Sequence, residues 1–275
     1  MVRVEMLAVG RELLIGRTVN TNAQWLGVRL ARKGSRLAEI TTVDDELVEI
    51  ASGLKGCLAR KPDFLIVVGG LGPTPDDMTL KGIARGIGSH LRLNTCALAL
   101  IREHYARRNL GGIEMTRART KMAVLPVGAD PVKNAVGTAP GVRLAFGSAI
   151  IFCLPGVPSE MKRMFRDSVE PLIVERLGTL SRKYRKLTVE GIYESTLAPL
   201  IASELKLHPG AYIKSHPRGI REGRSRIELD VAVVSKDESE AQKSITAIVG
   251  EIKNEIQTEG GKILAETDLD RQGSR

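Results

Sequence analysis

A short, nearly uninterrupted apolar segment constrains the fold most strongly. Residues 63–68, Asp-Phe-Leu-Ile-Val-Val, lie between Pro62 and a turn that begins at Gly69. This composition is typical of a strand buried on both faces of a parallel sheet, because helices cover both of its sides. The turn contains three glycines and leads into a helical pattern over 78–87. A buried strand followed by a helix indicates an α/β protein.

The alternation of strand, turn and helix recurs along the first part of the chain. Asp45 is a plausible cap for the helix that follows the second strand. The apolar periodicity predicts strands at 2–9, 37–43, 63–68 and 148–154, and helices at 21–33, 46–60, 78–87, 95–109, 114–123, 159–165 and 169–177. This order predicts a doubly wound, mostly parallel sheet in a domain spanning residues 1–178.

The pattern changes near residue 180, where we place a domain boundary. Strands are expected at 186–192, 211–215, 226–235 and 262–265, and helices at 196–205 and 238–256. The order β-α-β-β-α-β is that of a split βαβ, ferredoxin-like unit. It predicts a smaller α+β domain over 185–267, followed by a polar tail, 268–275, that is expected to be disordered.

Composition narrows the possible location and partners. The 275 residues carry a net charge of +9, only 3% aromatic residues and three cysteines without a CxxC motif. The odd cysteine number indicates reduced, intracellular chemistry. The sequence shows neither an apolar membrane span nor a signal peptide, so we expect a cytoplasmic protein without a membrane partner. The charge suits an anionic ligand. Nucleic-acid binding is not expected, because the basic residues are spread out, with the runs 102–108 and 117–121 interpreted as solvated helix faces.

The turn after the third strand is the strongest chemical signal. Glycines allow positive φ angles and a close approach of the backbone to a ligand. Their N–H groups, backed by a helix N-terminus, favour phosphate oxygens. A tight turn without a ligand is the alternative interpretation. The candidate phosphate-binding residues are Gly69, Gly70, Leu71, Gly72, Pro73 and Thr74, with Thr79 beyond them.

Two adjacent carboxylates, Asp76 and Asp77, follow this turn. One of them is accounted for as a helix cap. Together they offer the oxygen ligands that Mg²⁺ prefers, and either one is a candidate general base. The turn after the first strand, which contains Glu12, should lie at the same sheet edge, as should the turn after the strand at 148–154.

Four segments in order resemble the N-terminal domain of the CinA (competence-damage-inducible) proteins. They are GRELLIGRTVNTNAQWL, GGLGPTPDDMT, NAVGTAPG and LPGVPSEM, within residues 1 to about 170. That domain is similar to the molybdopterin-binding domain of MogA, MoaB and MoeA. The resemblance implies a three-layer α/β/α fold with a pterin- or nucleotide-phosphate pocket at the glycine turn. Arg11 stands where the family usually has an acidic or amide residue.

The resemblance also assigns roles to residues. Asp77 and Asp45 match the aspartates that matter in the molybdopterin enzymes, and Glu12 is matched in the first motif. The other matched motifs add Asn134, Gly137, Thr138, Pro155 and Gly156 as ligand-binding candidates. The deamidase domain of longer relatives does not follow, so deamidation is not expected. A dimer or trimer is expected, because homologous domains of this fold often form one.

These features favour three functions. The first is a metal-dependent pyrophosphohydrolase that acts on an ADP-ribose-like substrate. Asp45, Asp77 and Glu12 would be its catalytic residues, and Asp45, Asp76 and Asp77 would bind Mg²⁺, Mn²⁺ or Co²⁺. The alternative is a protein that binds or adenylylates molybdopterin. The third is a nucleotide-binding protein without catalytic activity.

Overall fold

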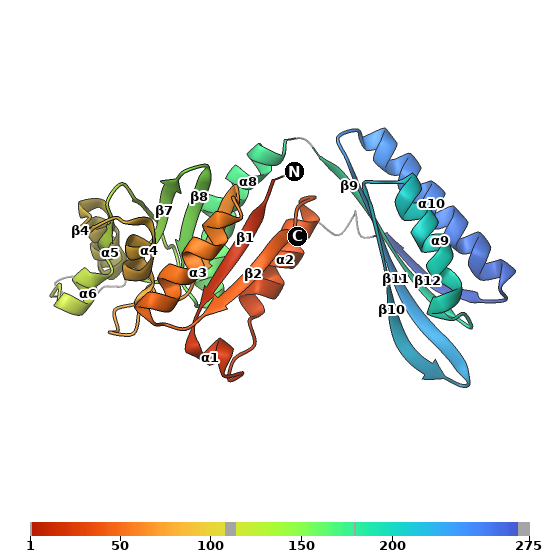
Figure 1. Cartoon of the computed structure of the whole chain (residues 1–275), viewed down its shortest axis with the longest axis horizontal. Coiled ribbons are helices and arrows are strands. Elements are labelled where there is room, and N and C mark those ends of the chain that lie inside the picture. The colour runs from red at the N-terminus through yellow and green to blue at the C-terminus, as the bar shows by residue number, and fades with distance from the viewer. Residues whose placement is uncertain (1, 108–113, 179, 269–275) are drawn as a thin grey trace. The chain divides into compact units, whose positions relative to one another are not determined.

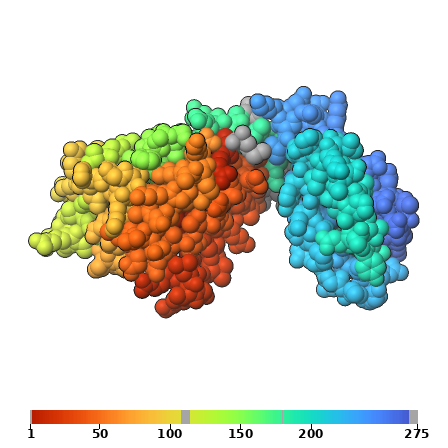
Figure 2. Space-filling model, viewed as in Figure 1, coloured from red at the N-terminus to blue at the C-terminus, as the bar shows by residue number. Residues whose placement is uncertain are grey.

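The computed structural model describes residues 2–107, 114–178 and 180–268 of the chain and divides it into two compact units after Gly178 (Figure 1). The surface of each unit is drawn in Figure 2. Each unit has its own hydrophobic core. Residues 269–275 of the expected disordered tail, and residues 108–109 at the end of an expected helix, lie outside the described residues.

A mixed, mostly parallel sheet forms the centre of the first unit, in the strand order β2-β1-β3-β8-β7-β6. The pairs β1–β2, β1–β3 and β3–β8 are parallel, whereas β7 pairs antiparallel with both of its neighbours. The strands are β1 (Val4–Val9), β2 (Leu37–Val43), β3 (Phe64–Val68), β6 (Asp130–Val132), β7 (Gly141–Phe146) and β8 (Ala149–Leu154). As expected for a doubly covered strand, β3 is buried at every position.

Helices cover both faces of this sheet, so the predicted three-layer α/β/α fold is confirmed (Figure 1). One face packs against α3 (Leu47–Ala59), α4 (Thr79–Ile87) and α5 (Thr95–Arg107). The other face packs against α2 (Thr21–Arg32), α7 (Pro158–Met164) and α8 (Glu170–Leu177), with the π-helical segment η1 (Phe165–Val169) between the last two. The short helix α1 (Arg11–Leu14) follows β1.

Four short or weakly patterned strands were not expected from the sequence. β6 and β7 form an antiparallel hairpin at one edge of the sheet. β4 (Leu91–Leu93) and β5 (Val124–Pro126) pair with each other outside the main sheet, and α6 (Arg117–Lys121) leads into β5. Strands of three residues contain too few positions for a period-two pattern to emerge.

The second unit contains the expected β-α-β-β-α-β order. Its sheet, β10-β11-β9-β12, is antiparallel throughout. The elements are β9 (Ser181–Glu190), α9 (Glu194–Leu207), β10 (Ala211–Arg221), β11 (Arg224–Ser235), α10 (Glu238–Thr258) and β12 (Lys262–Asp268). Both helices pack on one face of this sheet, around Leu187, Leu229 and Ile248. No helix within the described ranges is both long and apolar enough to cross a membrane.

Candidate functional site

The glycine turn after β3 has the backbone geometry that its sequence indicates. Gly69 has φ +112° and Gly70 has φ +62°, conformations that L residues with a side chain rarely adopt. A Cβ atom on Gly69 would lie 2.2 Å from the carbonyl oxygen of Val9, and one on Gly70 would lie 2.3 Å from Oγ1 of Thr79. Both positions therefore require glycine for conformation and for space.

Turns from separate strands meet at this edge of the sheet. The amide of Gly69 donates to the carbonyl of Leu154 at the end of β8, at 3.0 Å. The amide of Gly10, directly after β1, donates to Val43 at the end of β2, at 3.1 Å. A Cβ on Gly156 would lie 3.5 Å from the Cα of Gly69. The carboxyl ends of four strands thus form one edge, where open α/β sheets bind ligands.

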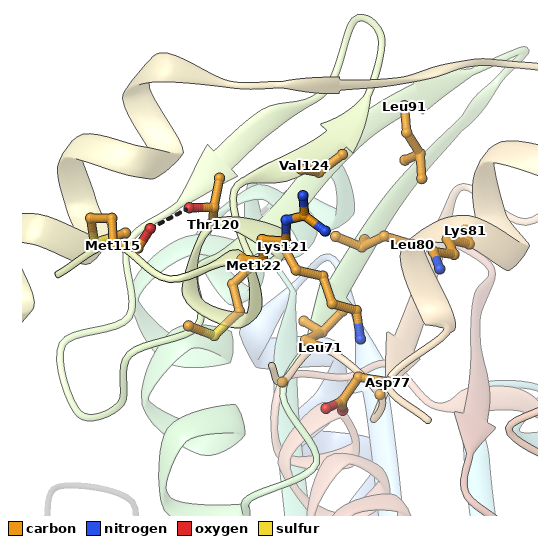
Figure 3. A pocket seen from close by; sticks show the side chains of 13 residues that line it. Leu71, Asp77, Leu80, Lys81, Leu91, Met115, Thr120, Lys121, Met122 and Val124 are labelled. Atoms are coloured by element: carbon orange, nitrogen blue, oxygen red, sulfur yellow. Dashed lines mark hydrogen bonds between the residues drawn. The ribbon is translucent and has the colours of Figure 1, made fainter. Parts of the chain in front are cut away.

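A cavity of about 350 Å³ opens beside the glycine turn (Figure 3). Gly70, Leu71, Gly72 and Asp77 of the predicted site line it. Most of the wall is apolar and is contributed by the turn, α4, β4, the residues flanking α6, and β5: Leu71, Leu80, Leu91, Met115, Met122 and Val124. A hydrogen bond from Thr120 to the carbonyl of Met115, at 3.4 Å, fixes part of the far wall. Such a wall suits the face of a flat ring.

Three cationic side chains, Lys81, Arg117 and Lys121, also line the cavity. Arg117 and Lys121 belong to the run that was interpreted as a solvated helix face. Arg117 is exposed, in agreement with that interpretation, whereas Lys121 is half-buried. Lys121 extends toward Asp77 in Figure 3, and its amino group donates a hydrogen bond to the carbonyl of Thr74. Burial lowers the pKa of Lys121, and Lys81 lowers it further, whereas Asp77 and Asp76 raise it. An anion in the cavity would favour the charged form of this lysine.

The backbone of the turn offers hydrogen-bond donors to the cavity. Within the described part of the chain, the amides of Gly70, Leu71 and Gly72 have no hydrogen-bond acceptor. All three residues line the cavity. Polar groups on the wall of a cavity gain from a partner, and successive N–H groups attract anions. The turn can therefore supply amide donors to a phosphate group.

Asp77 organises the second half of the same turn. Its Oδ2 accepts hydrogen bonds from the amide of Thr74 at 2.9 Å and from the Thr74 hydroxyl at 2.6 Å. A Cβ on Gly72 would lie 2.6 Å from this oxygen, so glycine leaves the space for the carboxylate. Hydrogen bonding by Thr74 and by its own backbone amide lowers the pKa of Asp76, as does the charge of Lys121. Because the Thr74 amide already donates to Asp77, an anion would bind nearer to residues 70–72.

The residues present do not fit the predicted divalent-metal site. Among the residues that the structure describes, no group of three or more histidine, cysteine, aspartate or glutamate side chains is arranged to hold a metal ion. Asp45 was expected to bind the metal together with Asp76 and Asp77. Its carboxylate instead accepts a hydrogen bond from the amide of Arg11 at 2.9 Å. It does not cap the helix that follows, since Glu46 is the N-cap of α3 and no side chain bonds there. The structure therefore gives no support to this metal site.

Arg11 and Glu12 show how the turn after β1 is held. The Arg11 guanidinium pairs with Asp44 at 2.9 Å and with Glu46 at 3.1 Å. The hydrogen bond with the Asp44 carboxylate raises the pKa of Arg11. The basic residue at this position therefore joins the turns after β1 and β2. The Glu12 carboxylate lies over Gly10, where a Cβ would meet it at 2.5 Å.

Several predicted ligand-binding residues have structural contacts instead of facing the cavity. Thr79 is fully buried, and its hydroxyl donates to the carbonyl of Gly69 at 2.8 Å. Thr138 lines a separate, small hollow beside Lys133 and Arg107. Pro73, Pro155 and Gly156 belong to the turns at the sheet edge and are not part of the cavity wall. Their proposed contact with a ligand stays a prediction.

Asn134 and Gly137 hold their loop against α7. The Asn134 side chain donates to Ala139 at 2.9 Å and to Glu160 at 2.7 Å, and it accepts from the amides of Val136 and Gly137. A Cβ on Gly137 would lie 2.1 Å from the Glu160 carboxylate. All of the ordinary hydrogen-bonding capacity of the Asn134 amide is therefore used inside the protein.

We expect Asn134→Ala to lower the free energy of unfolding by about 2 kcal/mol, because buried polar partners lose their hydrogen bonds. Urea denaturation followed by circular dichroism measures this change. Ligand affinity should fall little at temperatures where the variant is folded. Unchanged stability together with a large loss of affinity would instead identify Asn134 as a ligand contact.

The fold and the site define a class: a three-layer α/β protein with a glycine turn that opens onto a cationic, apolar-walled cavity. Residues 5–175 match the family model described as "Probable molybdopterin binding domain". The chain belongs to this family. Because the match contains the glycine turn, the cavity and α6, the site lies in the part of the chain that defines the family.

Individual relatives agree with this assignment. A protein from Aeropyrum pernix is 39% identical over 264 residues, covering 96% of this chain and 97% of the relative. A protein from Metallosphaera sedula is 39% identical over 259 residues, covering 94% and 96%. The first unit is also similar to the crystal structure of CinA, a protein with unknown function from Thermoplasma acidophilum. The identity is 39%, the TM-score is 0.56, and the match covers 62% of this chain and 98% of that one. The resemblance to CinA proteins is thus confirmed.

Proposed function

We propose that the first unit binds a phosphorylated pterin of the molybdopterin class in the cavity beside the glycine turn. One observation carries this proposal: amide donors, cationic side chains and an apolar wall surround the same space of about 350 Å³. The family description, "Probable molybdopterin binding domain", supports the same ligand class.

The chemistry of the wall assigns an orientation to the ligand. The phosphate would accept hydrogen bonds from the amides of residues 70–72 and from Lys121, since charged donors make the stronger bonds to phosphate. The bicyclic ring would lie against the apolar side chains, among them Leu80 and Met115. Asp77, on the same wall, offers a carboxylate acceptor for ring N–H groups.

Isothermal titration calorimetry with 6-hydroxymethylpterin phosphate tests the proposal, with the unphosphorylated 6-hydroxymethylpterin as the matched comparison. The phosphorylated compound should bind at least about tenfold more tightly, because only it uses the charge-assisted hydrogen bonds. Absence of binding for both compounds, in a sample that unfolds cooperatively, would rule the proposal out.

Hydrolysis of an ADP-ribose-like dinucleotide is a second candidate, favoured by the position of Asp77 on the cavity wall next to the amides of the turn. Those amides would hold a diphosphate, and the carboxylate is a candidate general base for water. Incubation with ADP-ribose, with and without Mg²⁺, Mn²⁺ or Co²⁺, should then release AMP. No AMP under any of these conditions excludes this activity.

Asp77→Asn and Asp77→Ala separate a chemical role of Asp77 from its role in the turn. Asp77→Ala should lower the free energy of unfolding by about 1 kcal/mol, because the Thr74 amide loses its cap. Asp77→Asn keeps an oxygen for that bond and should be close to wild type in stability. If the protein transfers an adenylyl group from ATP to the pterin or hydrolyses ADP-ribose, both variants should lose turnover. If it is a binding protein without catalysis, Asp77→Asn should lose only the contact of one carboxylate oxygen with the ring N–H groups, which lowers ligand affinity by about tenfold or less.

The expected dimer or trimer stays a prediction. Size-exclusion chromatography with light scattering would determine it, and a mass of one chain at every concentration would contradict it.

A further inference from the structure

Both helices of the second unit pack on one face of its sheet, and among the described residues of this unit no helix packs on the other face. On β9 and β11 the odd-numbered residues, such as Leu187 and Leu229, are buried against α9 and α10. Side chains alternate along a strand, so the even-numbered residues of these strands point to the opposite side. Their register partners on β10 and β12 share that side. We call this surface the open face.

Two tyrosines form one row across the open face. Tyr212 on β10 pairs in register with Ala232 on β11, which in turn pairs with Tyr184 on β9. The small alanine separates the two rings. Tyr212 is 56% exposed. The guanidinium of Arg182 lies 5.2 Å from the centroid of the Tyr184 ring. Exposed rings held on a sheet, and guanidinium planes that lie over such rings, are surfaces on which nucleobases stack.

Basic side chains dominate the rest of the open face. Among the described residues, eight Lys and Arg residues share this side with three acidic residues. The acidic residues are Glu190, Glu228 and Asp230. The basic residues are Arg182, Lys186, Lys214, Arg218, Arg221, Arg224, Arg226 and Lys262.

The ion pairs of the open face leave an excess of positive charge. Glu228 is shared by Lys186 and Arg218, both at 2.7 Å, and these two cations lower its pKa to about 2. Glu190 is shared by Arg226 at 3.1 Å and Arg224 at 3.8 Å. Each of these carboxylates is therefore surrounded by two cations, so every such group carries a net positive charge. The pairing also restrains the arginine side chains in place.

The end of the β10–β11 hairpin shows that stability alone does not explain this charge. A two-residue turn, Glu222-Gly223, has positive φ at both positions, 50° and 77°. It places Arg221 directly opposite Arg224. Like charges directly opposite each other on a sheet are destabilising. A network that served only to stabilise the sheet would place an acidic residue here.

We propose that the open face binds single-stranded nucleic acid. The phosphates would contact the basic residues of the hairpin, and bases would stack on Tyr212 and on the Arg182 guanidinium that lies over Tyr184. The sequence-based expectation against nucleic acid rested on the scatter of basic residues along the chain and on the few aromatic residues. The β-strand register gathers seven of those basic residues and two of the four tyrosines on one face, and the ion pair with Glu228 adds Arg218 to it.

Fluorescence anisotropy of the full chain tests the proposal, with labelled RNA and DNA strands of about twelve nucleotides and a duplex of the same length. Both single strands should bind more tightly than the duplex, and their affinity should fall steeply with salt. Tighter binding of either the RNA or the DNA strand shows whether the natural ligand contains ribose or deoxyribose. No anisotropy change at low salt, or equal binding of the duplex, would overturn the proposal.

Two variants with matched charge loss identify the surface. Lys214→Gln with Arg218→Gln should weaken binding about tenfold and reduce its salt dependence. Lys206→Gln with Lys243→Gln removes the same charge from exposed positions of α9 and α10 and should change affinity less than about twofold. Equal weakening by both pairs would overturn the assignment to the open face.

Tyr212→Ala should weaken binding about tenfold without changing the salt dependence, because it removes a stacking ring and no charge. Tyr212→Phe keeps the ring and should bind like the wild type. Circular dichroism establishes that each variant is folded. If Tyr212→Phe and Tyr212→Ala bind as the wild type does, stacking at this residue is ruled out.

Discussion

Gly69→Ala is expected to lower the free energy of unfolding by about 3 kcal/mol. Its φ of +112° is a strained conformation for alanine, which costs on the order of 1–3 kcal/mol. The new Cβ would also lie 2.2 Å from the carbonyl oxygen of Val9, at the carboxyl end of β1, an inner strand of the sheet. Relief of this contact requires β1 and β3 to separate. Urea denaturation gives the change in free energy, and ligand affinity should fall with it because the turn is displaced.

Gly88→Ala is the matched control for backbone strain. Gly88 ends α4 in the left-handed conformation, with φ +69°, and no atom lies within 4 Å of the position of a Cβ. Alanine there should cost only about 1 kcal/mol. Equal losses for the two variants would show that the contact with Val9 is relieved without cost. That result would contradict the close approach of the two strand ends on which the site depends.

Lys121→Glu should weaken binding of a phosphorylated pterin by about 3 kcal/mol, on the order of a hundredfold. The variant removes a charged donor from the cavity and places a carboxylate beside the phosphate. Binding of the unphosphorylated pterin should change far less, since its ring contacts the apolar wall. Calorimetric titration of both compounds gives the two affinities. In the wild type, binding should also weaken at alkaline pH, because Lys121 loses its proton and its positive charge there. Burial lowers the pKa of Lys121, so this loss begins at a lower pH than for an exposed lysine.

The control for this charge reversal is Lys55→Glu, on the exposed side of α3. It changes the net charge equally but leaves the cavity intact, so the affinity for the phosphorylated pterin should fall only slightly. A similar loss in both variants would assign the effect to the overall charge. If Lys121→Glu binds both pterins more weakly and Lys55→Glu does not, the loss would be assigned to a change in the shape of the cavity. Such a change would follow from the lost hydrogen bond between Lys121 and the carbonyl of Thr74.

The local patterns predicted those parts of the fold that local chemistry determines. β2 matches its expected bounds, and β3 and α2 differ from theirs by one residue, because a buried apolar run or a 3.6-residue period marks each of them. The β6–β7 hairpin was missed. β7, with the sequence Gly-Val-Arg-Leu-Ala-Phe, has exposed residues among buried ones, and its direction depends on pairing with β8. Such tertiary pairing leaves no clear trace in a short segment.

The residues of the candidate site likewise fall into two groups, those that the sequence predicted and those that it did not. Gly70, Gly72 and Asp77 could be recognised because their residue types suit a phosphate-binding turn, and all three line the cavity. Lys81 and Lys121 were missed because they come from different helices, α4 and α6, which only the tertiary fold brings to the same cavity. One signal was available: in the basic run 117–121, the apolar residues Met115 and Met122 flank the charges. Apolar residues at both ends of a short basic helix indicate that this helix is not fully exposed to solvent.

The two sides of the cavity differ in how much change they can tolerate. On the glycine side, Gly69 precedes the cavity wall and lies against main-chain atoms of Val9 and Gly156, so a side chain at this position would require a strand to move. On the α6 side, Met115 and Met122 line the cavity, and methionine adapts readily to new neighbours. Divergence among relatives, and directed evolution in the laboratory, should therefore alter ligand preference through the α6 side, while the glycine side passes unchanged from one specificity to the next.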